Sequence, residues 1–380
     1  MVEIHNPSSN SLLNSLNEQQ QSAVLNTRGP MLVLAGAGTG KTTVITRRIA
    51  HLIASGVQPE QILAVTFTKK AALEMKQRVQ SSLGGTIDSL TVCTFHALGH
   101  RLLRENRVRT SSCANVNLIS PKQQRQLVGD VLLQTDLAER LGIREATREI
   151  GRAKVTAAIA AGSSQTEFER MVAEYERELN RRRQVDFDDL LALPVQILRG
   201  SNALHSMYQD RWRYILVDEY QDTSELQHLL VQLLVAPERN LCVVGDDDQS
   251  IYGFRGASAE KMLNFRHDFP GARVLKLEQN YRSMAEIIDL ANSVIERSAQ
   301  RYRKTLRSHL GCGGLVIQER AQVPDGPLAG AHPAAVPGLH LDDVVGVLLE
   351  DAHQQPAGGQ LVPLLESEGR PREGRAHFGG

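Results

Sequence analysis

A glycine-rich stretch near the N-terminus carries the residue types that hold phosphate groups. The order LVLAGAGTGKTTVITRRIAHL gives an apolar run, a glycine loop and then a helical pattern. The N–H groups of such a loop bind phosphate oxygens, the lysine reaches the β- and γ-phosphates, and the threonine hydroxyl ligates Mg²⁺. Ala35 stands where the strict pattern has glycine, and a flexible turn before a helix is the alternative interpretation. The predicted nucleotide-binding residues are Ala35, Gly36, Ala37, Gly38, Thr39, Gly40, Lys41, Thr42 and Thr43, with Lys41 catalytic and Thr42 a metal ligand.

A pair of acidic residues in YILVDEYQDT complements this loop. Asp218 and Glu219 follow an apolar run of strand length, and acids at a strand end are also common without any catalytic role. Beside a phosphate-binding loop they predict a hydrolytic site. Asp218 would hold Mg²⁺, mainly through water, and Glu219 would orient and deprotonate the attacking water.

The segment VVGDDDQSIYGFRGA, from Val243 to Ala257, combines an apolar strand with three aspartates, a glutamine, two aromatic residues and an arginine. A core strand needs none of these groups, and a plain surface turn does not need the aromatic residues. The simple alternative is a solvated acidic turn followed by core aromatic residues. The function of this segment can be inferred only together with the other motifs of the chain.

Six short apolar runs alternate with helical patterns, which predicts an α/β fold with a buried parallel sheet. Ligands collect at the carboxyl ends of the strands in such sheets, and the polar residues described above lie at those ends. The six runs are 31–36, 61–67, 90–95, 214–219, 241–246 and 273–278.

The remaining segments differ in pattern. Between residues 108 and 207 charged and apolar residues recur at helical spacing, which predicts a helical subdomain inserted into the α/β core. From Gly311 onward the chain has no lysine and holds half of its prolines, so residues 311–380 are predicted to form a low-complexity, disordered tail.

Composition narrows the class of protein. Lysine plus arginine and aspartate plus glutamate number 43 each, so nucleic acid would have to bind a local basic stripe. Four scattered cysteines without a C-x-x-C pair argue against zinc and favour a reducing, cytoplasmic compartment. Neither a signal peptide nor an apolar window of membrane-span length is present, so a membrane partner is not expected.

Taken in order, these stretches resemble the superfamily 1 DNA helicases of the UvrD/Rep/PcrA group over roughly residues 14–310. The resemblance implies a RecA-like P-loop NTPase core that uses ATP and Mg²⁺ to move 3′ to 5′ on single-stranded DNA, with duplex junctions as a further substrate, in repair or replication restart. It divides the chain into a first RecA-like domain (1–107 and 208–275), the helical subdomain (108–207) and the start of a second RecA-like domain (276–310). The matching stretches are LNEQQQSAV, AGAGTGKT, VTFTKKAALEMKQR, CTFHALGHRLLR, ILVDEYQDT, VVGDDDQSIYGFRGA and LEQNYRS.

The resemblance also implies roles for single residues of the nucleotide site. Gln20 would read the adenine edge, and Tyr252 would pack beside the base. Gln249 would sense hydrolysis at the γ-phosphate, and Arg255 would link its loop to the nucleotide. Arg282 would be an arginine finger supplied by the second motor domain.

Contacts to DNA are implied in the same way. Phe67 and Phe254 would offer faces on which bases stack. Lys69, Arg101 and Arg104 would neutralise backbone phosphates, unless they are ordinary solvated charges. The full set of expected DNA contacts is Thr66, Phe67, Thr68, Phe95, His96 and Phe254.

The chain departs from the group after its NYRS motif. Members continue for several hundred residues, with a further arginine finger, and residues 311–380 show no counterpart. The change in composition there predicts a shifted reading frame or a truncated gene. Two alternatives to a helicase follow: a DNA-stimulated ATPase that strips proteins from DNA, and an inactive nucleotide- and DNA-binding remnant. The motor part of a helicase–nuclease is less favoured, because the tail lacks a cluster of acids with a lysine.

Overall fold

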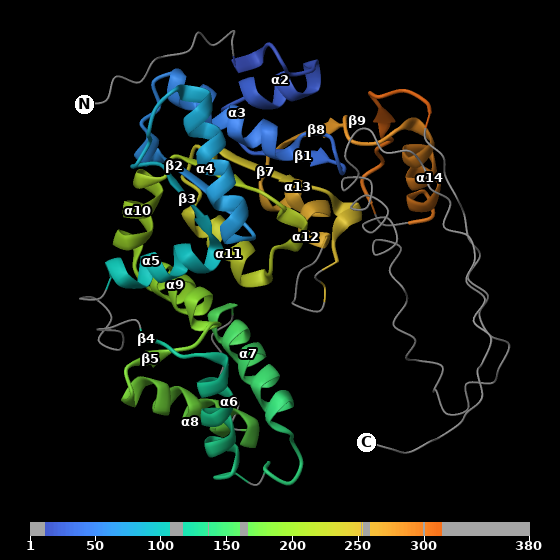
Figure 1. Cartoon of the computed structure of the whole chain (residues 1–380). Helices are drawn as coiled ribbons and strands as arrows, with labels where there is room; N and C mark the ends of the chain where they lie inside the picture. The colour runs from blue at the N-terminus through green and yellow to red at the C-terminus, as the bar shows by residue number, and fades with distance from the viewer. Residues whose placement is uncertain are drawn as a thin grey trace, which may run out of the picture. The chain divides into compact units, whose positions relative to one another are not determined.

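Helices and strands alternate through most of the chain, as the sequence predicts (Figure 1). The computed structural model describes residues 12–106, 117–135, 137–159, 166–251, 253, 259–298 and 301–313. The strands are β1 (Met31–Ala35), β2 (Ile62–Thr66), β3 (Thr91–Thr94), β4 (Asn117–Leu118), β5 (Gln184–Val185), β6 (Tyr214–Val217), β7 (Leu241–Gly245), β8 (Arg273–Leu277), β9 (Gln279–Asn280) and β10 (Arg307–Ser308). The α-helices are α2 (Glu18–Leu25), α3 (Lys41–Ala54), α4 (Lys69–Leu83), α5 (Phe95–Glu105), α6 (Pro121–Leu132), α7 (Ile143–Ile159), α8 (Glu167–Arg181), α9 (Asp189–Gly200), α10 (Asn202–Arg211), α11 (Glu225–Leu234), α12 (Glu260–Leu263), α13 (Phe265–Asp268) and α14 (Ala285–Ile295). Short 3₁₀ turns are η1 (Pro59–Gln61), η2 (Tyr220–Asp222) and η3 (Asp247–Gln249).

The six apolar runs all become strands of one parallel sheet, in the order β3-β2-β6-β7-β1-β8. The predicted α/β fold is therefore confirmed. Each strand ends one or two residues before its apolar run does, so that Asp218 and Asp246 lie immediately after β6 and β7. Because all strands run the same way, these ends share one edge of the sheet.

Alternation along each strand divides the core into two layers. Met31 and Val33 of β1 face the layer that α3 and α4 cover, while Leu32 and Leu34 face the layer formed with α5, α9 and α11. Every residue of β1, β2 and β7 is buried on one side or the other. This double burial explains why the strands read as continuous apolar runs.

The helical insert has a core of its own. Helices α6, α7 and α8 contribute most of its buried residues, which run from Ile119 to Leu179. A buried ammonium, Lys154 Nζ, lies 2.7 Å from both Asp186 Oδ2 and Asp189 Oδ1 at the point where the insert returns to the sheet. Helices α9 and α10 pack in the sheet's core instead, and the expected boundary at residue 207 falls inside α10.

The segment after β8 forms small elements beside the sheet. Strand β8 completes the sheet next to β1, and β9 pairs with β10 in a separate two-stranded parallel ladder. Helix α14 packs on β10. The expectation that residues 276–310 begin a second RecA-like domain stays a prediction, as do the other domain boundaries.

No helix among the described residues is long and apolar enough to cross a membrane. The predicted tail, residues 311–380, lies outside the described residues from position 314 onward, so its predicted disorder and the predicted frame shift stay predictions.

Helices α5 and α9 meet at a point that tolerates only glycine. Pro194 lies inside α9 and lacks an N–H, which leaves the Leu190 carbonyl without its usual helical partner. A Cβ at Gly99 of α5 would lie 1.7 Å from that carbonyl oxygen.

We therefore expect Gly99→Ala to lower the free energy of unfolding by about 1–3 kcal/mol or more, because the two helix backbones must separate. Urea denaturation measures the change. The matched control is Gly200→Ala on α9, where a Cβ meets nothing within 4 Å. Equal stability of the two variants would contradict the close approach.

Candidate active site

The phosphate-binding loop joins β1 to α3, and its glycines are required by its backbone. Gly38 has a φ of 69° and Gly40 a φ of 90°, a region that residues with a Cβ rarely adopt. Gly40 is the N-cap of α3, so the N-terminus of that helix opens into the loop. The Thr39 hydroxyl donates to the Gly36 carbonyl over 2.8 Å and fixes the turn from inside.

Three sequence motifs meet at the ammonium group of Lys41. Lys41 Nζ donates to Glu219 Oε2 over 2.9 Å and to Gln249 Oε1 over 3.1 Å. The three residues follow β1, β6 and β7, which are neighbours in the order β6-β7-β1. The sheet thus brings together three of the four residues predicted to be catalytic.

Glu219 is held in a strained conformation. Its φ and ψ are both 50°, a left-handed conformation that costs a non-glycine residue about 1–3 kcal/mol unless its surroundings impose it. Gln221 Nε2 donates to Glu219 Oε2 over 2.8 Å, so the carboxylate is oriented from two sides. The next residue, Tyr220, is buried, and its hydroxyl lies 2.6 Å from His228 Nδ1. This anchor holds the turn that presents Glu219.

Asp218 is a buried carboxyl group beside the loop, with 6% of its surface exposed. Burial raises its pKa to about 7, the charge of Glu219 adds to the rise, and Lys41 opposes it. A carboxylate kept from water near a phosphate-binding loop fits a divalent cation, which would supply the missing positive charge. Asp218 and the hydroxyl of Thr42, at the start of α3, are the residues that would hold Mg²⁺.

The predicted adenine reader, Gln20, lies directly against the loop. Its side chain is buried, and Nε2 donates to the Thr39 carbonyl over 2.9 Å. Its Oε1 accepts from the Asn17 N–H in a capping box at the start of α2. Asn17 Nδ2 in turn donates to the Tyr281 hydroxyl over 2.8 Å, which places an aromatic side chain at this end of the site.

Residues after β8 cover the loop. Asn280 Nδ2 donates to the Ala37 carbonyl over 2.7 Å, and the Tyr281 N–H donates to the Gly38 carbonyl over 2.9 Å. A Cβ at Gly38 would lie 2.7 Å from Arg282 Cβ, so the expected arginine finger begins its side chain at the loop. Asn280 and Tyr281 are not among the site residues predicted from the sequence. Gly38 could have indicated that another segment packs on the loop, because a residue with a Cβ at this position would block such a close contact.

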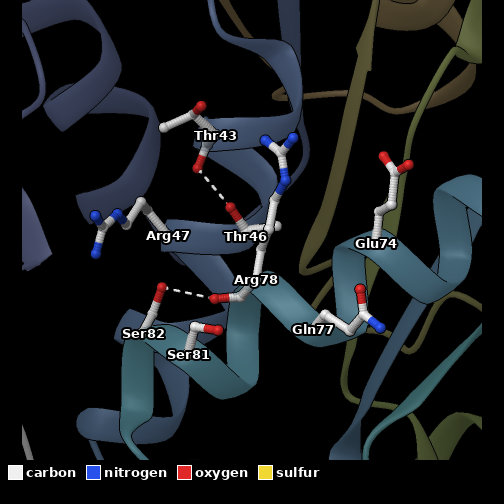
Figure 2. Close-up of a pocket in the computed structure, with 8 residues that line it drawn as sticks. All are labelled: Thr43, Thr46, Arg47, Glu74, Gln77, Arg78, Ser81 and Ser82. Atoms are coloured by element: carbon white, nitrogen blue, oxygen red, sulfur yellow. Dashed lines mark hydrogen bonds between the residues drawn. The ribbon is translucent and has the colours of Figure 1, made fainter.

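A pocket near the start of α3 does not coincide with the predicted phosphate site. This pocket of about 320 Å³ lies between α3 and α4, lined by the side chains shown in Figure 2. Thr43 is its sole residue from the nine predicted to bind nucleotide, and neither Lys41 nor Glu219 lines it. Asn280 and Arg282 lie against the loop itself.

The expected DNA contacts fall into two groups. Phe67 is half-buried at the end of β2, and Thr68 is exposed as the N-cap of α4, with its hydroxyl accepting from the Ala71 N–H. Thr66, by contrast, is 1% exposed, and Phe95 is 4% exposed in the main core. Phe95 is buried because it starts the apolar face of α5, so we do not retain it as a stacking residue.

His96 stacks on Phe187, an aromatic residue that is not among the predicted site residues. Its ring lies 4.0 Å from that of Phe187, centroid to centroid, at 24°. Burial lowers the pKa of His96 to about 4, so the imidazole is neutral near pH 7. Phe187 is 53% exposed, so the outer face of the stacked pair is an aromatic ring open to solvent.

The expected phosphate contacts also differ from one another. Arg101 forms an ion pair with Glu105 at 2.8 Å, and its guanidinium lies over the Trp212 ring. The positive charge of Arg101 therefore already interacts with groups of the protein. Lys69 and Arg104 are exposed. Tyr252, Phe254 and Arg255 lie outside the described residues, so the roles expected for them stay predictions.

A parallel sheet with a glycine loop, a lysine and two acids at its carboxyl edge defines a P-loop protein with a RecA-like core. Residues 16–270 match the family model described as the UvrD/REP helicase N-terminal domain. The chain therefore belongs to the UvrD/REP helicase family.

Individual relatives agree with this assignment. The chain is 41% identical to proteins named ATP-dependent DNA helicase PcrA from Staphylococcus aureus, over 306 residues, and from Bacillus subtilis, over 307 residues, covering 78% of this chain and 42% of each relative. It is 41% identical over 321 residues to the protein of that name from Leuconostoc citreum, covering 82% of this chain and 43% of the relative. The chain thus spans less than half the length of the curated relatives that it matches.

The raised pKa of Asp218 predicts how metal binding depends on pH. A proton and a cation compete for the same carboxylate, so Mg²⁺ affinity should be highest above pH 7 and fall about tenfold for each pH unit below it. Titration of Mn²⁺, a paramagnetic substitute, monitored by electron spin resonance measures this slope.

Asp218→Asn should abolish both the binding and its pH dependence. Asp222→Asn is the matched control, because burial also raises the pKa of Asp222 to about 7, although we assign it no metal. A pH slope that survives in Asp218→Asn would remove Asp218 from the metal site.

Proposed function

We propose that this chain binds and hydrolyses ATP with Mg²⁺ and couples that reaction to movement on single-stranded DNA, as the N-terminal part of a helicase motor. The observation that carries the proposal is the meeting of Lys41, Glu219 and Gln249 at one point. These residues come from three separate motifs, and an NTPase needs all three functions together: charge on the γ-phosphate, a base, and a group that orients water.

The groups at this point would act in sequence. The Lys41 ammonium would leave its ion pair with Glu219 and bind a phosphate oxygen instead, because the nucleotide carries a larger negative charge than one carboxylate. Glu219, released from the ion pair, would accept the proton of the attacking water. Gln249 would orient that water, and Arg282 would stabilise the charge that develops as the terminal phosphoryl group leaves. Bound Mg²⁺ would neutralise the phosphates, held by Thr42 and Asp218.

Finer aspects of the proposal rest on the family. They are translocation from 3′ to 5′, action at duplex junctions, and a role in repair or replication restart. We assign four of the described residues to contacts with the DNA: the half-buried Phe67 and the exposed Thr68 and Lys69, which follow β2, and the exposed Arg104 near the end of α5. The cytoplasmic location expected from the sequence stays a prediction.

Hydrolysis provides the first test. The rate of phosphate release by the chain should rise when single-stranded DNA is added. Lys41→Ala should lower that rate by about 100-fold or more, since stabilisation of developing charge is a large catalytic term. Glu219→Gln should retain ATP binding and lose turnover.

Lys70→Ala is the matched control, because that side chain is 88% exposed on α4. Turnover by Glu219→Gln at the parent rate would exclude Glu219 as the base. Hydrolysis without strand displacement would identify a DNA-stimulated ATPase, and nucleotide binding without hydrolysis would identify a binding module.

Binding of single-stranded DNA provides the second test. Phe67→Ala should weaken it by about 1–3 kcal/mol with little dependence on base sequence, because every base can stack. The salt dependence should hardly change, since Phe67 neutralises no phosphate. Arg104→Ala should instead reduce the slope of log affinity against log salt by about one unit.

Fluorescence anisotropy over a range of salt concentrations measures both quantities, and thermal unfolding checks that each variant is folded. Unchanged affinity in a folded Phe67→Ala protein would return this residue to a packing role.

A further inference from the structure

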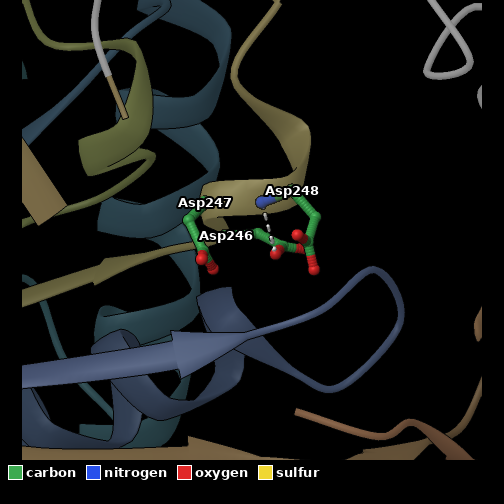
Figure 3. A group of neighbouring side chains, drawn as sticks. All are labelled: Asp246, Asp247 and Asp248. Carbon is green, nitrogen blue, oxygen red and sulfur yellow. Dashed lines mark hydrogen bonds between the residues drawn. The ribbon is translucent and has the colours of Figure 1, made fainter. Parts of the chain in front are cut away.

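The three consecutive aspartates after β7 have no part in the hydrolysis described above. Asp246 follows the strand, and Asp247 and Asp248 begin η3. Their carboxylates point to the same side of the short helix and lie within 4.8 Å of one another (Figure 3). Asp246 is 3% exposed and Asp247 8%. Carboxylates that are both buried and close together require a positive charge.

The structure supplies that charge from a lysine 56 residues beyond Asp248. Lys304 Nζ lies 2.7 Å from Asp246 Oδ1, 2.7 Å from Asp247 Oδ1 and 2.6 Å from Asp248 Oδ2. Only 2% of the lysine side chain is exposed. Although burial lowers the pKa of Lys304, the three carboxylates outweigh it and raise that pKa above its usual value, so the side chain is charged. The ammonium occupies the place that a metal ion would otherwise take.

Neighbours of Lys304 strengthen the same junction. Arg301 Nε lies 2.9 Å from Asp248 Oδ1, and the Tyr302 N–H donates to Asp247 Oδ2 over 2.6 Å. The junction therefore joins residues 301–304 to η3 through three ion pairs of Lys304, one of Arg301 and a backbone hydrogen bond.

Asp246 connects this junction to the two groups that act on water. The Gln249 N–H donates to the Asp246 carbonyl over 3.0 Å, which closes η3. The Asp246 N–H donates to Gln221 Oε1 over 3.0 Å, and Gln221 Nε2 donates to Glu219 Oε2. A shift of Asp246 would consequently displace both Gln249 and Glu219.

The same segment also reaches the phosphate-binding loop. Leu306, two residues beyond Lys304, packs on Gly36, where a Cβ would lie 2.6 Å from Leu306 Cδ2. Two hydrogen bonds with Asn292 hold the backbone of Leu306. The Leu306 N–H donates to Asn292 Oδ1 over 3.1 Å, and Asn292 Nδ2 donates to the Leu306 carbonyl over 2.8 Å. Residues 301–306 thus span the site from η3 to the loop.

We propose that Lys304 is a positioning residue for ATP hydrolysis, acting as an internal cation that fixes η3 so that Gln249 and Glu219 face Lys41. The role of Lys304 in turnover rests on the proposed function, whereas its hold on η3 does not. This role of Lys304 explains why three aspartates precede Gln249, because each of them pairs with the same lysine.

The first arm of the test needs no nucleotide. Hydrogen exchange of the peptide that contains residues 246–250 is measured by mass spectrometry in Lys304→Met and in the control Lys122→Met, an exposed lysine on α6. Lys304→Met should accelerate exchange in this peptide, and Lys122→Met should not. Unchanged protection in Lys304→Met would overturn the proposal. If that variant does not fold, Asp248→Asn replaces it, because it keeps the shape and removes one partner of Lys304, and the same direction is expected.

The second arm asks whether Lys304 acts through Gln249. DNA-stimulated ATP hydrolysis is compared in the parent, Lys304→Met, Gln249→Ala and the double variant. Lys304→Met should slow turnover by about 10- to 100-fold with little change in KM, because a displaced water-orienting group affects the chemical step. In the Gln249→Ala background the same substitution should have a much smaller effect.

Equal fold-losses in both backgrounds would reduce Lys304 to a structural role and overturn the proposal. A parent protein without any hydrolysis would instead refute the proposed function, and the exchange arm would still decide whether Lys304 holds η3.

Discussion

The ion pair between Lys41 and Glu219 is the interaction on which the account of this site depends. It joins the phosphate-binding loop to the acidic strand end over 2.9 Å, with 12% of the lysine side chain exposed and 34% of the glutamate. The pair is available only because the parallel sheet sets the ends of β1, β6 and β7 side by side. The charge that would bind a phosphate and the base that would activate water neutralise each other here, so nucleotide binding must separate them.

The carboxyl edge of the sheet contains two groups of acidic residues, which differ in the positively charged side chains that pair with them. Asp218 and Glu219 after β6 face one ammonium, and burial raises the pKa of Asp218 toward neutrality, which leaves a place for a further cation. Asp246, Asp247 and Asp248 after β7 are matched by Lys304, and Asp248 also by Arg301. Among the described residues Asp218 thus forms no ion pair of its own, whereas every carboxylate of the second group forms one, and that group serves to fix geometry.

Much of this arrangement could be predicted from the sequence because it depends on local patterns. Strands buried on both faces must be continuous apolar runs, and all six runs proved to be strands of the sheet. A tight loop between a strand and a helix needs glycine where φ is positive, and Gly38 and Gly40 have φ values of 69° and 90°. The order of the strands, which the structure supplies, then places Lys41, Glu219 and Gln249 together.

What could not be predicted depends on contacts between distant segments. Lys304 lies in the basic stretch RYRK, which matches no motif, and only the folded chain shows its three carboxylate partners. Phe95 illustrates the reverse error: it ends an apolar run, yet it shares the buried side of α5 with Leu98 and Leu102, three and seven residues on. That helical spacing was present in the sequence and should have assigned Phe95 to the core.

We infer that Glu219 and the nucleotide compete for the Lys41 ammonium group. Calorimetric titration with a non-hydrolysable ATP analogue, in the parent chain and in Glu219→Gln, measures this competition most directly. The glutamine cannot form the ion pair, so Lys41 is already free to meet the phosphate, and the variant should bind the analogue more tightly than the parent. Glu225→Gln, which alters an exposed carboxylate on α11 that pairs with Lys261, should leave the affinity unchanged. Equal or weaker binding by Glu219→Gln would contradict the claim that Glu219 and the nucleotide compete for one ammonium group.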